Sequence, residues 1–289
     1  MARILGGEDV ERLVDPAELV KDVEMVLKSD AHAPPRQALE HQGSWFGVMP
    51  AAGLGYYAVK LVGVYPSNPR RGLPLVRGTL LLFDAGSGEL LLEADAGPAT
   101  GWRTAAATAL ALRLLGYQGG GVLGVIGAGV QADYHTRMIK LLYQPDNIIV
   151  YDIDHARARR FAEKHGGRTV GLEELHSESD LLVAATTSTS PVVKGALLRR
   201  GAYVASIGAP RPVRELDDEA KKRARCILVD TIEGARRETD DVEGVEELVE
   251  LRQVVRGEKA CSPGEIRVYK SVGTALLDLA IAIHLYRRL

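Results

Sequence analysis

The sequence predicts an α/β fold in which a Rossmann-type, doubly wound parallel sheet is joined to a second, discontinuous α+β domain. From residue 121 onward, apolar runs of strand length alternate with helical stretches, as in a parallel sheet covered on both faces. Before residue 93, short β-type runs alternate with turn signals, as in an antiparallel sheet. We expect the Rossmann domain at 119–264 and the second domain at 1–118 together with 265–289.

The first region is expected to begin with a helix and continue as sheet. Asp15-Pro16 is a cap and first-turn signal, and apolar residues at helical spacing follow it as far as Lys28. The further elements expected here are β-type runs at 55–62 and 78–83, a hairpin turn at 84–88, and an Ala/Leu-rich helix from Thr100 to Leu115 that Gly116 closes.

The second region is expected to supply the strands of the parallel sheet. The apolar runs that predict them lie at 122–126, 147–152, 180–185, 203–207 and 226–230. The acidic sequence from Thr239 to Glu250 is expected to be helical. An apolar helix from about Val272 to Arg287 is expected to return to the first region.

The overall composition excludes several classes of protein. The 289 residues carry a net charge of −2 with both signs spread along the chain, so we expect neither a nucleic-acid nor a membrane-surface partner. No apolar run approaches the ~20 residues that span a bilayer, and no signal peptide is visible. Cys226 and Cys261 show neither metal-ligand spacing nor a disulfide framework. We therefore expect Cys226 to be a packed thiol, no bound metal, and a reducing, cytoplasmic setting.

One loop carries the strongest functional signal. Gly127-Ala128-Gly129-Val130-Gln131-Ala132 fits the dinucleotide pattern G-x-G-x-x-G/A, and it follows an apolar strand and opens a helix, as that pattern requires. Gly127 permits the tight turn, Gly129 lets the backbone approach a pyrophosphate, and the small Ala132 lets the helix pack on the sheet. The helix N-terminus would then bind the phosphates.

The residues at the ends of neighbouring strands indicate which dinucleotide is bound. Asp152 lies about twenty residues past the loop, where a carboxylate accepts ribose hydroxyls and repels a 2′-phosphate, which favours NAD over NADP. NADP stays open because a nearby arginine group at 157–160 could neutralise that phosphate. Thr186 ends the strand expected to meet the cofactor, where its hydroxyl would bond the dinucleotide or serve as a plain turn residue.

Three basic residues of the first region suit an enclosed anion site. Arg36 follows Pro34-Pro35, Lys60 lies between apolar neighbours, and Arg103 is placed in the first turn of the helix expected from Thr100. A cation is disfavoured at a helix N-terminus unless it shares an anion with the free amides there. Arg103 would therefore hold a substrate carboxylate with bidentate geometry. Taken singly, each residue is also compatible with a surface cation.

Seven blocks of the chain, in order, resemble the ornithine cyclodeaminase/μ-crystallin family: 47–51, 60–62, 82–84, 103–106, 127–132, 214–219 and 269–273. The resemblance covers essentially the whole chain. It implies a homodimer that associates through the sheet of the discontinuous, substrate-binding domain.

The resemblance also implies roles for individual residues. Arg36 and Arg103 would hold the substrate carboxylate, Lys60 would be the catalytic or substrate-binding residue beside the reacting carbon, and Val272 would contact substrate. The positions that match the family's cofactor residues outside the glycines are Val130, Gln131, Asp152, Thr186 and Ser271.

At two positions this chain differs from the pattern of ornithine cyclodeaminases, and both differences bear on the reaction. Ornithine cyclodeaminases resemble one another in a Glu two residues before the Met-Pro pair and an Asp after the glycine of the fifth-strand loop, where this chain has Gly47 and Ala209. Neither residue can bind the distal amine of ornithine. The surrounding blocks resemble instead the μ-crystallin (ketimine reductase) and archaeal alanine dehydrogenase-like branch.

Three functions are compatible with these observations. The leading one is an NAD(P)-dependent oxidoreductase acting on a small, carboxylate-bearing imino or amino acid. It would reduce a cyclic ketimine such as Δ1-pyrroline- or Δ1-piperideine-2-carboxylate, or act like alanine dehydrogenase on pyruvate and ammonia. The second is an ornithine cyclodeaminase that forms proline with NAD as an internal redox cofactor. The third is a non-enzymatic, μ-crystallin-like nucleotide and ligand carrier. In the enzymes, Lys60 would have a lowered pKa and would exchange a proton with the substrate.

Overall fold

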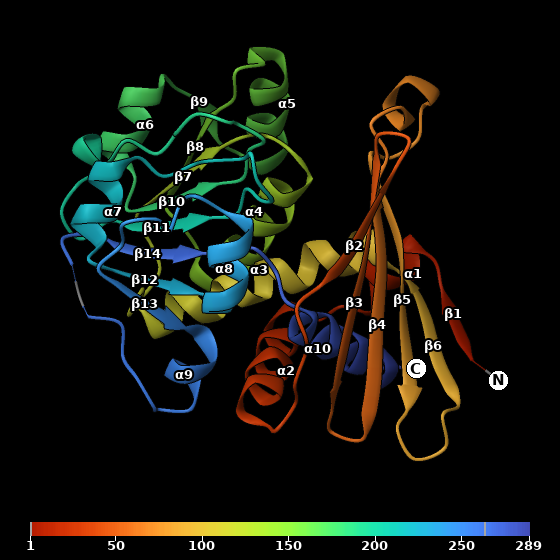
Figure 1. Cartoon of the computed structure of the whole chain (residues 1–289). Coiled ribbons are helices and arrows are strands. Elements are labelled where there is room, and N and C mark those ends of the chain that lie inside the picture. The colour runs from red at the N-terminus through yellow and green to blue at the C-terminus, as the bar shows by residue number, and fades with distance from the viewer. Residues whose placement is uncertain (1, 263) are drawn as a thin grey trace. The chain divides into compact units, whose positions relative to one another are not determined.

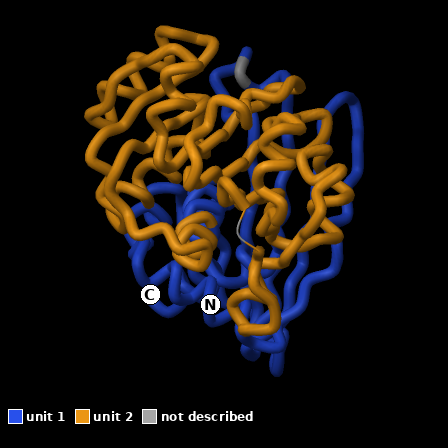
Figure 2. The backbone as a smooth tube through the Cα atoms, turned by 90° about the vertical axis from the view of Figure 1, so that its left-hand side faces the viewer, with its two compact units in different colours: residues 1–107, 274–289 blue, residues 108–273 orange. Residues whose placement is uncertain are grey.

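The computed structural model describes residues 2–262 and 264–289. The chain forms two compact units, one of residues 1–107 with 274–289 and the other of residues 108–273 (Figure 2). The predicted boundaries at 118/119 and 264/265 differ from these. The first observed boundary, at 107/108, lies within helix α3 (Ala96–Leu114), whose last residues belong to unit 2. The second lies after strand β14 (Arg267–Lys270), because this strand belongs to the parallel sheet of unit 2.

Unit 1 is built on a six-stranded sheet of order β1-β6-β5-β4-β3-β2, antiparallel except for the parallel pair β1 and β6. Its strands are β1 (Arg3–Leu5), β2 (Gln37–His41), β3 (Ser44–Gly53), β4 (Tyr56–Val64), β5 (Val76–Asp84) and β6 (Leu90–Asp95). Its helical elements are α1 (Gly7–Leu13), α2 (Pro16–Lys28), the short 3-10 turn η1 (Asn68–Arg71), the first part of α3, and α10 (Ala275–Tyr286). The predicted helix at 15–28, the sheet and the returning C-terminal helix are confirmed.

Helix α10 covers one face of this sheet. It contacts β3, β4, β5 and β6 on one side and α2 on the other (Figure 1). Eleven of its twelve residues, all but Tyr286, are buried, and a helix that is apolar nearly all round requires such cover. In the register of the sheet, Met49 pairs with Lys60 and Lys60 with Leu80, so these three side chains share the face beneath α10.

Unit 2 is a parallel sheet of order β13-β12-β14-β11-β10-β7-β8-β9. Its strands are β7 (Val122–Ile126), β8 (Asn147–Tyr151), β9 (Arg168–Thr169), β10 (Leu181–Ala184), β11 (Tyr203–Ser206), β12 (Cys226–Val229), β13 (Glu247–Glu250) and β14. Its helices are α4 (Val130–Tyr143), α5 (His155–His165), α6 (Leu172–Glu178), α7 (Asp218–Ala224), α8 (Ile232–Glu238) and α9 (Leu251–Val255), with a 3-10 turn η2 (Gly195–Leu197). All five predicted strands are confirmed to within one residue at either end.

Helices cover both faces of the parallel sheet (Figure 1). Side chains of α6, α7 and α8 pack into the apolar cluster on one face, and those of α4 and α5 pack into the cluster on the other. The order of the strands reverses at β7, which lies between β8 and β10. In such sheets the crevice at the carboxyl ends of the strands beside this switch point is where ligands bind.

The helix predicted from Thr239 to Glu250 is wrong. Residues 239–246 form turns, and 247–250 form strand β13. Asp241 is fully buried and its Oδ1 accepts hydrogen bonds from the amides of Glu215 and Leu216, both at 2.9 Å. The Thr239 hydroxyl accepts a hydrogen bond from the Asp241 amide at 3.1 Å, and such a local bond to the backbone favours a turn over a helix.

The prediction of an unpaired Cys226 is also wrong, because Cys226 and Cys261 form a disulfide with their Cα atoms 5.7 Å apart. Their sequence separation of 35 gives no local sign of the pairing, which arises because β12 lies beside β14 and Cys261 precedes β14 in the chain. Because the two cysteines are paired, they no longer support the expectation of a reducing compartment. Within the described ranges, no helix has the length and apolarity to cross a membrane.

Candidate active site

The dinucleotide loop has the conformation that its glycines predict. It connects β7 to α4, with Gly129 as the residue that caps the helix. Gly127 has φ +91°, and a Cβ there would lie 2.6 Å from the carbonyl oxygen of Ala185, so only glycine fits. Beside Gly129, by contrast, no atom lies within 4 Å of where a Cβ would be. The loop therefore leaves open space at the N-terminus of a 14-residue helix, where a pyrophosphate would bind.

Asp152 ties this loop to the end of β8. Its Oδ2 accepts a hydrogen bond from the amide of Ala128, and its Oδ1 accepts one from the amide of Asp154, both at 2.8 Å. Each carboxylate oxygen retains a further lone pair for a ribose hydroxyl. Among the other predicted cofactor residues, Val130 is 69% exposed at the start of α4, and the Oε1 of Gln131 is buried without a hydrogen-bond partner in the described structure. These residues fit a dinucleotide.

The buried carboxylate of Glu215 holds the loops that follow β10 and β11. The sequence did not single out this residue as part of the site. Glu215 is fully buried, and its Oε1 accepts hydrogen bonds from the amide and hydroxyl of Thr186 at 2.7 and 3.0 Å. Its Oε2 accepts from the Ser206 hydroxyl at 2.7 Å and from the Gly208 amide at 2.8 Å. Thr186 follows β10 and Gly208 follows β11, so one side chain fixes both loops at the carboxyl edge of the sheet.

Lys270, at the end of β14, is the positive partner of this carboxylate. Its Nζ lies 3.8 Å from the Oε2 of Glu215 and 2.8 Å from the Oδ2 of Asp241, and it donates hydrogen bonds to Ser206 and the Gly208 carbonyl. The side chains of all three charged residues are fully buried. Burying one such charge unpaired would be far more costly than burying the group together.

A second buried carboxylate, Asp230, holds the segment that contains the predicted site residues Ser271 and Val272. Its Oδ2 accepts from the Ser271 hydroxyl at 2.9 Å and from the amides of Val272 and Gly273 at 2.8 and 2.6 Å. The Tyr269 hydroxyl donates to its other oxygen. Asp230 therefore determines the backbone of residues 271–273.

In unit 1 the structure places two of the three predicted basic residues around a common carboxylate. Lys60 on β4 donates a hydrogen bond to the Oδ1 of Asp278 at 2.9 Å, and the Nε of Arg103 on α3 lies 3.1 Å from the same oxygen. The three side chains are between 2% and 6% exposed. Arg36 directly precedes β2, and its charge acts on Lys60 as well.

The environment changes the acidity of Lys60 as expected. Burial lowers its pKa, the neighbouring Arg103 lowers it further and Arg36 adds to this, while Asp278 opposes the change by attracting the ammonium group. The net result is a pKa of about 7 instead of 10.5. An amine with this pKa is suited to exchange a proton near neutral pH.

The predicted position of Arg103 in a first helical turn is wrong. Helix α3 begins at Ala96, because Pro98 is tolerated in a first turn and Asp95 accepts a hydrogen bond from the Gly97 amide at 2.8 Å. Arg103 is therefore the eighth residue of the helix, without free amides beside it. Asp278, and not a helix N-terminus, provides the anion that accounts for this buried cation.

Three atoms of this cluster are buried without a hydrogen-bond partner among the described residues: the Nε and Nη1 of Arg103 and the Oδ2 of Asp278. The Nε is nevertheless in an ion pair with the Oδ1 of Asp278 at 3.1 Å. A buried donor or acceptor left unpaired costs about 1–3 kcal/mol. Such atoms mark a place where a ligand supplies the missing partners. The orphan arginine donor suits a carboxylate.

Gly47 lies on the face of the sheet that carries Lys60, and Trp45 occupies the space beside it. A Cβ at residue 47 would lie 2.4 Å from the Trp45 ring. A glutamate here would have to displace that ring.

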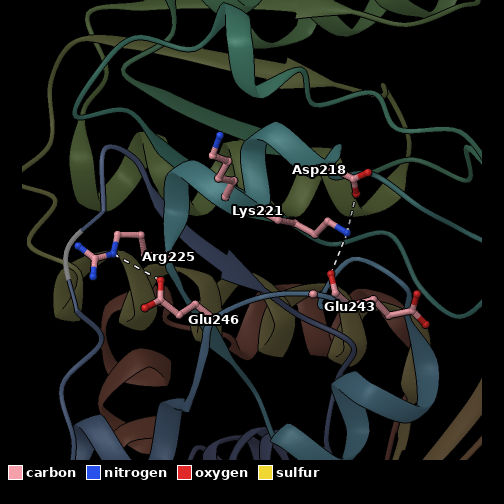
Figure 3. Close-up of a pocket in the computed structure, with 7 residues that line it drawn as sticks. Asp218, Lys221, Arg225, Glu243 and Glu246 are labelled. Carbon is pink, nitrogen blue, oxygen red and sulfur yellow. Dashed lines mark hydrogen bonds and ion pairs between the residues drawn. The ribbon is translucent and has the colours of Figure 1, made fainter.

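Figure 3 shows a different hollow, a cavity of about 340 Å³ in unit 2. Its charged residues pair with one another, Lys221 with Asp218 at 2.8 Å and Arg225 with Glu246 at 3.7 Å. None of the predicted site residues lines it. The hollow has no part in the candidate site.

The sequence and fold of this chain are similar to those of known proteins. The profile of the ornithine cyclodeaminase/mu-crystallin family matches residues 2–289. The chain belongs to this family. The alanine dehydrogenase of Archaeoglobus fulgidus is 32% identical over 302 residues, which cover 98% of this chain and 94% of that protein.

Two solved structures of family members have the same fold. The Δ1-pyrroline-2-carboxylate reductase of Thermococcus litoralis, in complex with NADH and L-proline, superposes with a TM-score of 0.90 at 32% identity, covering 99% of this chain and 96% of the other. An archaeal alanine dehydrogenase dimer with bound NAD superposes with a TM-score of 0.91 at 30% identity, covering 99% and 95%.

The buried network in unit 2 makes a testable prediction about stability. Glu215→Ala leaves Lys270 and four hydrogen-bond donors without this acceptor, so we expect the free energy of unfolding to fall by about 3–5 kcal/mol. Urea unfolding followed by circular dichroism measures it. The control Glu219→Ala alters an exposed side chain and should change stability by less than about 0.5 kcal/mol. Equal losses in the two variants would contradict the assignment.

Proposed function

We propose that this protein is an NAD-dependent oxidoreductase that reduces small imino acids to amino acids. The observation that carries the proposal is the buried group of Lys60, Arg103 and Asp278, with a lysine whose pKa is about 7 and an arginine donor that lacks a partner. Support comes from family members of similar length, one a Δ1-pyrroline-2-carboxylate reductase with NADH and proline, another an alanine dehydrogenase with NAD.

The cofactor would be held by unit 2. Gly127 to Gln131 would bind the pyrophosphate, Asp152 the ribose, and the segments of Thr186 and Ser271 the remainder of the dinucleotide. The carboxylate of Asp152 would repel a 2′-phosphate, which supports NAD over NADP.

The substrate would be held by unit 1, with Arg36 and Arg103 binding its carboxylate. Bound NADH supplies the hydride that reduces the C=N carbon. The ammonium group of Lys60 donates a proton to the substrate nitrogen, becomes neutral and is reprotonated from solvent. Positioning and this proton transfer are the contributions of the protein.

The same residues disfavour ornithine as substrate. A diamino acid needs a carboxylate for its distal amine, and the family positions that would supply one hold Gly47 and Ala209 here. The ring of Trp45 fills the space beside Gly47. The substrate would therefore carry an apolar side chain or a plain ring, such as a five- or six-membered cyclic imine or the imine of pyruvate.

A substrate panel tests the function directly. Purified protein with NADH should oxidise the cofactor in the presence of Δ1-pyrroline-2-carboxylate, Δ1-piperideine-2-carboxylate, or pyruvate with ammonia, as measured by the loss of absorbance at about 340 nm that accompanies nicotinamide oxidation. Proline formed from ornithine without net cofactor oxidation would show a cyclodeaminase instead. Ligand binding without turnover on any substrate would show a carrier.

The proton-transfer role of Lys60 predicts opposite pH profiles in the two directions. Imine reduction requires the ammonium form, so kcat/KM should fall about tenfold per pH unit above pH 7, while amine oxidation requires the neutral form and should rise through the same range. Lys60→Met should lower kcat at least about 100-fold and leave NADH affinity unchanged. A fully active variant would remove Lys60 from the mechanism.

A homodimer would form through the face of the unit 1 sheet that is turned away from α10. The residues on that face are mainly apolar and only partly buried: Val48, Pro50, Tyr57, Val59, Leu61, Leu81 and Phe83. The archaeal alanine dehydrogenase is a dimer. Light scattering should give twice the chain mass of 31.2 kDa, and Leu81→Arg should yield monomers where Glu219→Arg does not. A monomeric wild type would refute this proposal.

A further inference from the structure

Asp278 has one carboxylate oxygen that is fully engaged and one that is not. Its Oδ1 lies 2.9 Å from the Nζ of Lys60 and 3.1 Å from the Nε of Arg103. Its Oδ2 is buried with no hydrogen-bond partner in the described part of the chain. Since an aspartate oxygen is only an acceptor when ionised, the partner that Oδ2 lacks is a donor.

Within the bounds of α10, the side chains one turn from Asp278 supply no donor. Its nearest neighbours on α10, one turn away in either direction, are Ala275, Ile281 and Ala282, all buried and apolar. Across the sheet, Lys60 is flanked by Met49 and Leu80. His284 lies further along α10, and it is occupied by Asp22 of α2 at 2.7 Å and by the Asp15 amide.

Both ion pairs that the described residues make with Asp278 involve cations. Lys60 and Arg103 contact it, and Arg36 acts on the same cluster through Lys60. Beside the ion pair between the Nε of Arg103 and the Oδ1 of Asp278, the same two groups hold a donor and an acceptor with no hydrogen-bond partner among the described residues: the Nη1 of Arg103 and the Oδ2 of Asp278. A ligand that presents a carboxylate and an N–H on adjacent atoms satisfies both. A protonated 2-imino acid and its 2-amino acid product have that arrangement, whereas 2-oxo acids have an acceptor in place of the N–H.

We infer that Asp278 is a substrate-binding residue whose Oδ1 orients Lys60 and Arg103 and whose Oδ2 accepts a hydrogen bond from the nitrogen at C2 of the substrate. The inference rests on the proposed function and adds to it the residue that recognises nitrogen. After Lys60 has donated its proton, the positive charge on the substrate nitrogen lies beside the carboxylate. Asp278 thereby selects imino and amino acids over 2-oxo acids, which present only an acceptor at C2.

Two inert, planar probes test this selection without turnover. Pyrrole-2-carboxylate has an N–H beside its carboxylate, and furan-2-carboxylate has an oxygen acceptor in the same place. Calorimetric titration of the intact protein, with and without NAD, should show at least about tenfold tighter binding of the pyrrole, equivalent to about 1.4 kcal/mol. Equal affinities of the wild type for the two probes would overturn the inference.

The variant Asp278→Asn sharpens the test. The two cations retain the amide oxygen at the position of Oδ1, so the amide NH2 takes the place of Oδ2 and turns an acceptor into a donor. The preference should then vanish or reverse toward the furan. The control Asp22→Asn removes the carboxylate that pairs with His284 on the same helix and should retain the wild-type preference. A pyrrole preference retained in Asp278→Asn would also overturn the inference.

These outcomes separate the inference from the proposed function. A protein that reduces imines without preferring the pyrrole keeps its proposed function and loses this role of Asp278. A protein that prefers the pyrrole through Asp278 without reducing any imine loses the proposed function and retains the nitrogen-binding site.

Discussion

The ion pair between Lys60 and Asp278 is the contact on which unit 1 depends. A lysine on the covered face of a sheet requires a counter-charge, and the carboxylate comes from a helix 218 residues later in the chain. Apart from Asp278 and His284, the buried residues of α10 are apolar, so their burial and the charge of Asp278 together place the helix over β4. Arg103 uses the same carboxylate, and a segment of chain that is remote in sequence thereby completes the cluster.

Unit 2 uses buried carboxylates in a related way. Glu215 and Asp230 lie near the carboxyl edge of the parallel sheet, and most of their hydrogen bonds come from backbone amides and hydroxyls of adjoining loops. Loops at this edge have few regular hydrogen bonds of their own, so a carboxylate that accepts several donors makes them rigid. The segments held in this way contain Thr186, Ser271 and Val272, the residues that the family resemblance assigns to ligands.

The similarity to relatives and the residues of the candidate site both point to chemistry on imino or amino acids. Relatives that act on imino or amino acids share the whole length of this chain. By the family resemblance, Gly47 and Ala209 stand where cyclodeaminases would carry acidic residues. The ring of Trp45 fills the space that a side chain at residue 47 would need.

Features that depend on neighbouring residues can be predicted from the local sequence. The glycine loop, the strand before it and Asp152 follow one another within a single β-α-β unit, so local pattern was sufficient to predict them. The three basic residues could be named singly, yet not as a group, and α3 begins at Ala96, four residues before the predicted start at Thr100. Their partners, in contrast, are set by packing between distant segments: Asp278 for Lys60 and Arg103, Lys270 for Glu215, and Cys261 for Cys226. An acidic residue within an apolar helix or a lysine that ends a strand signals a buried charge, but the identity of its partner depends on which distant segments pack together, and periodicity carries no information about that.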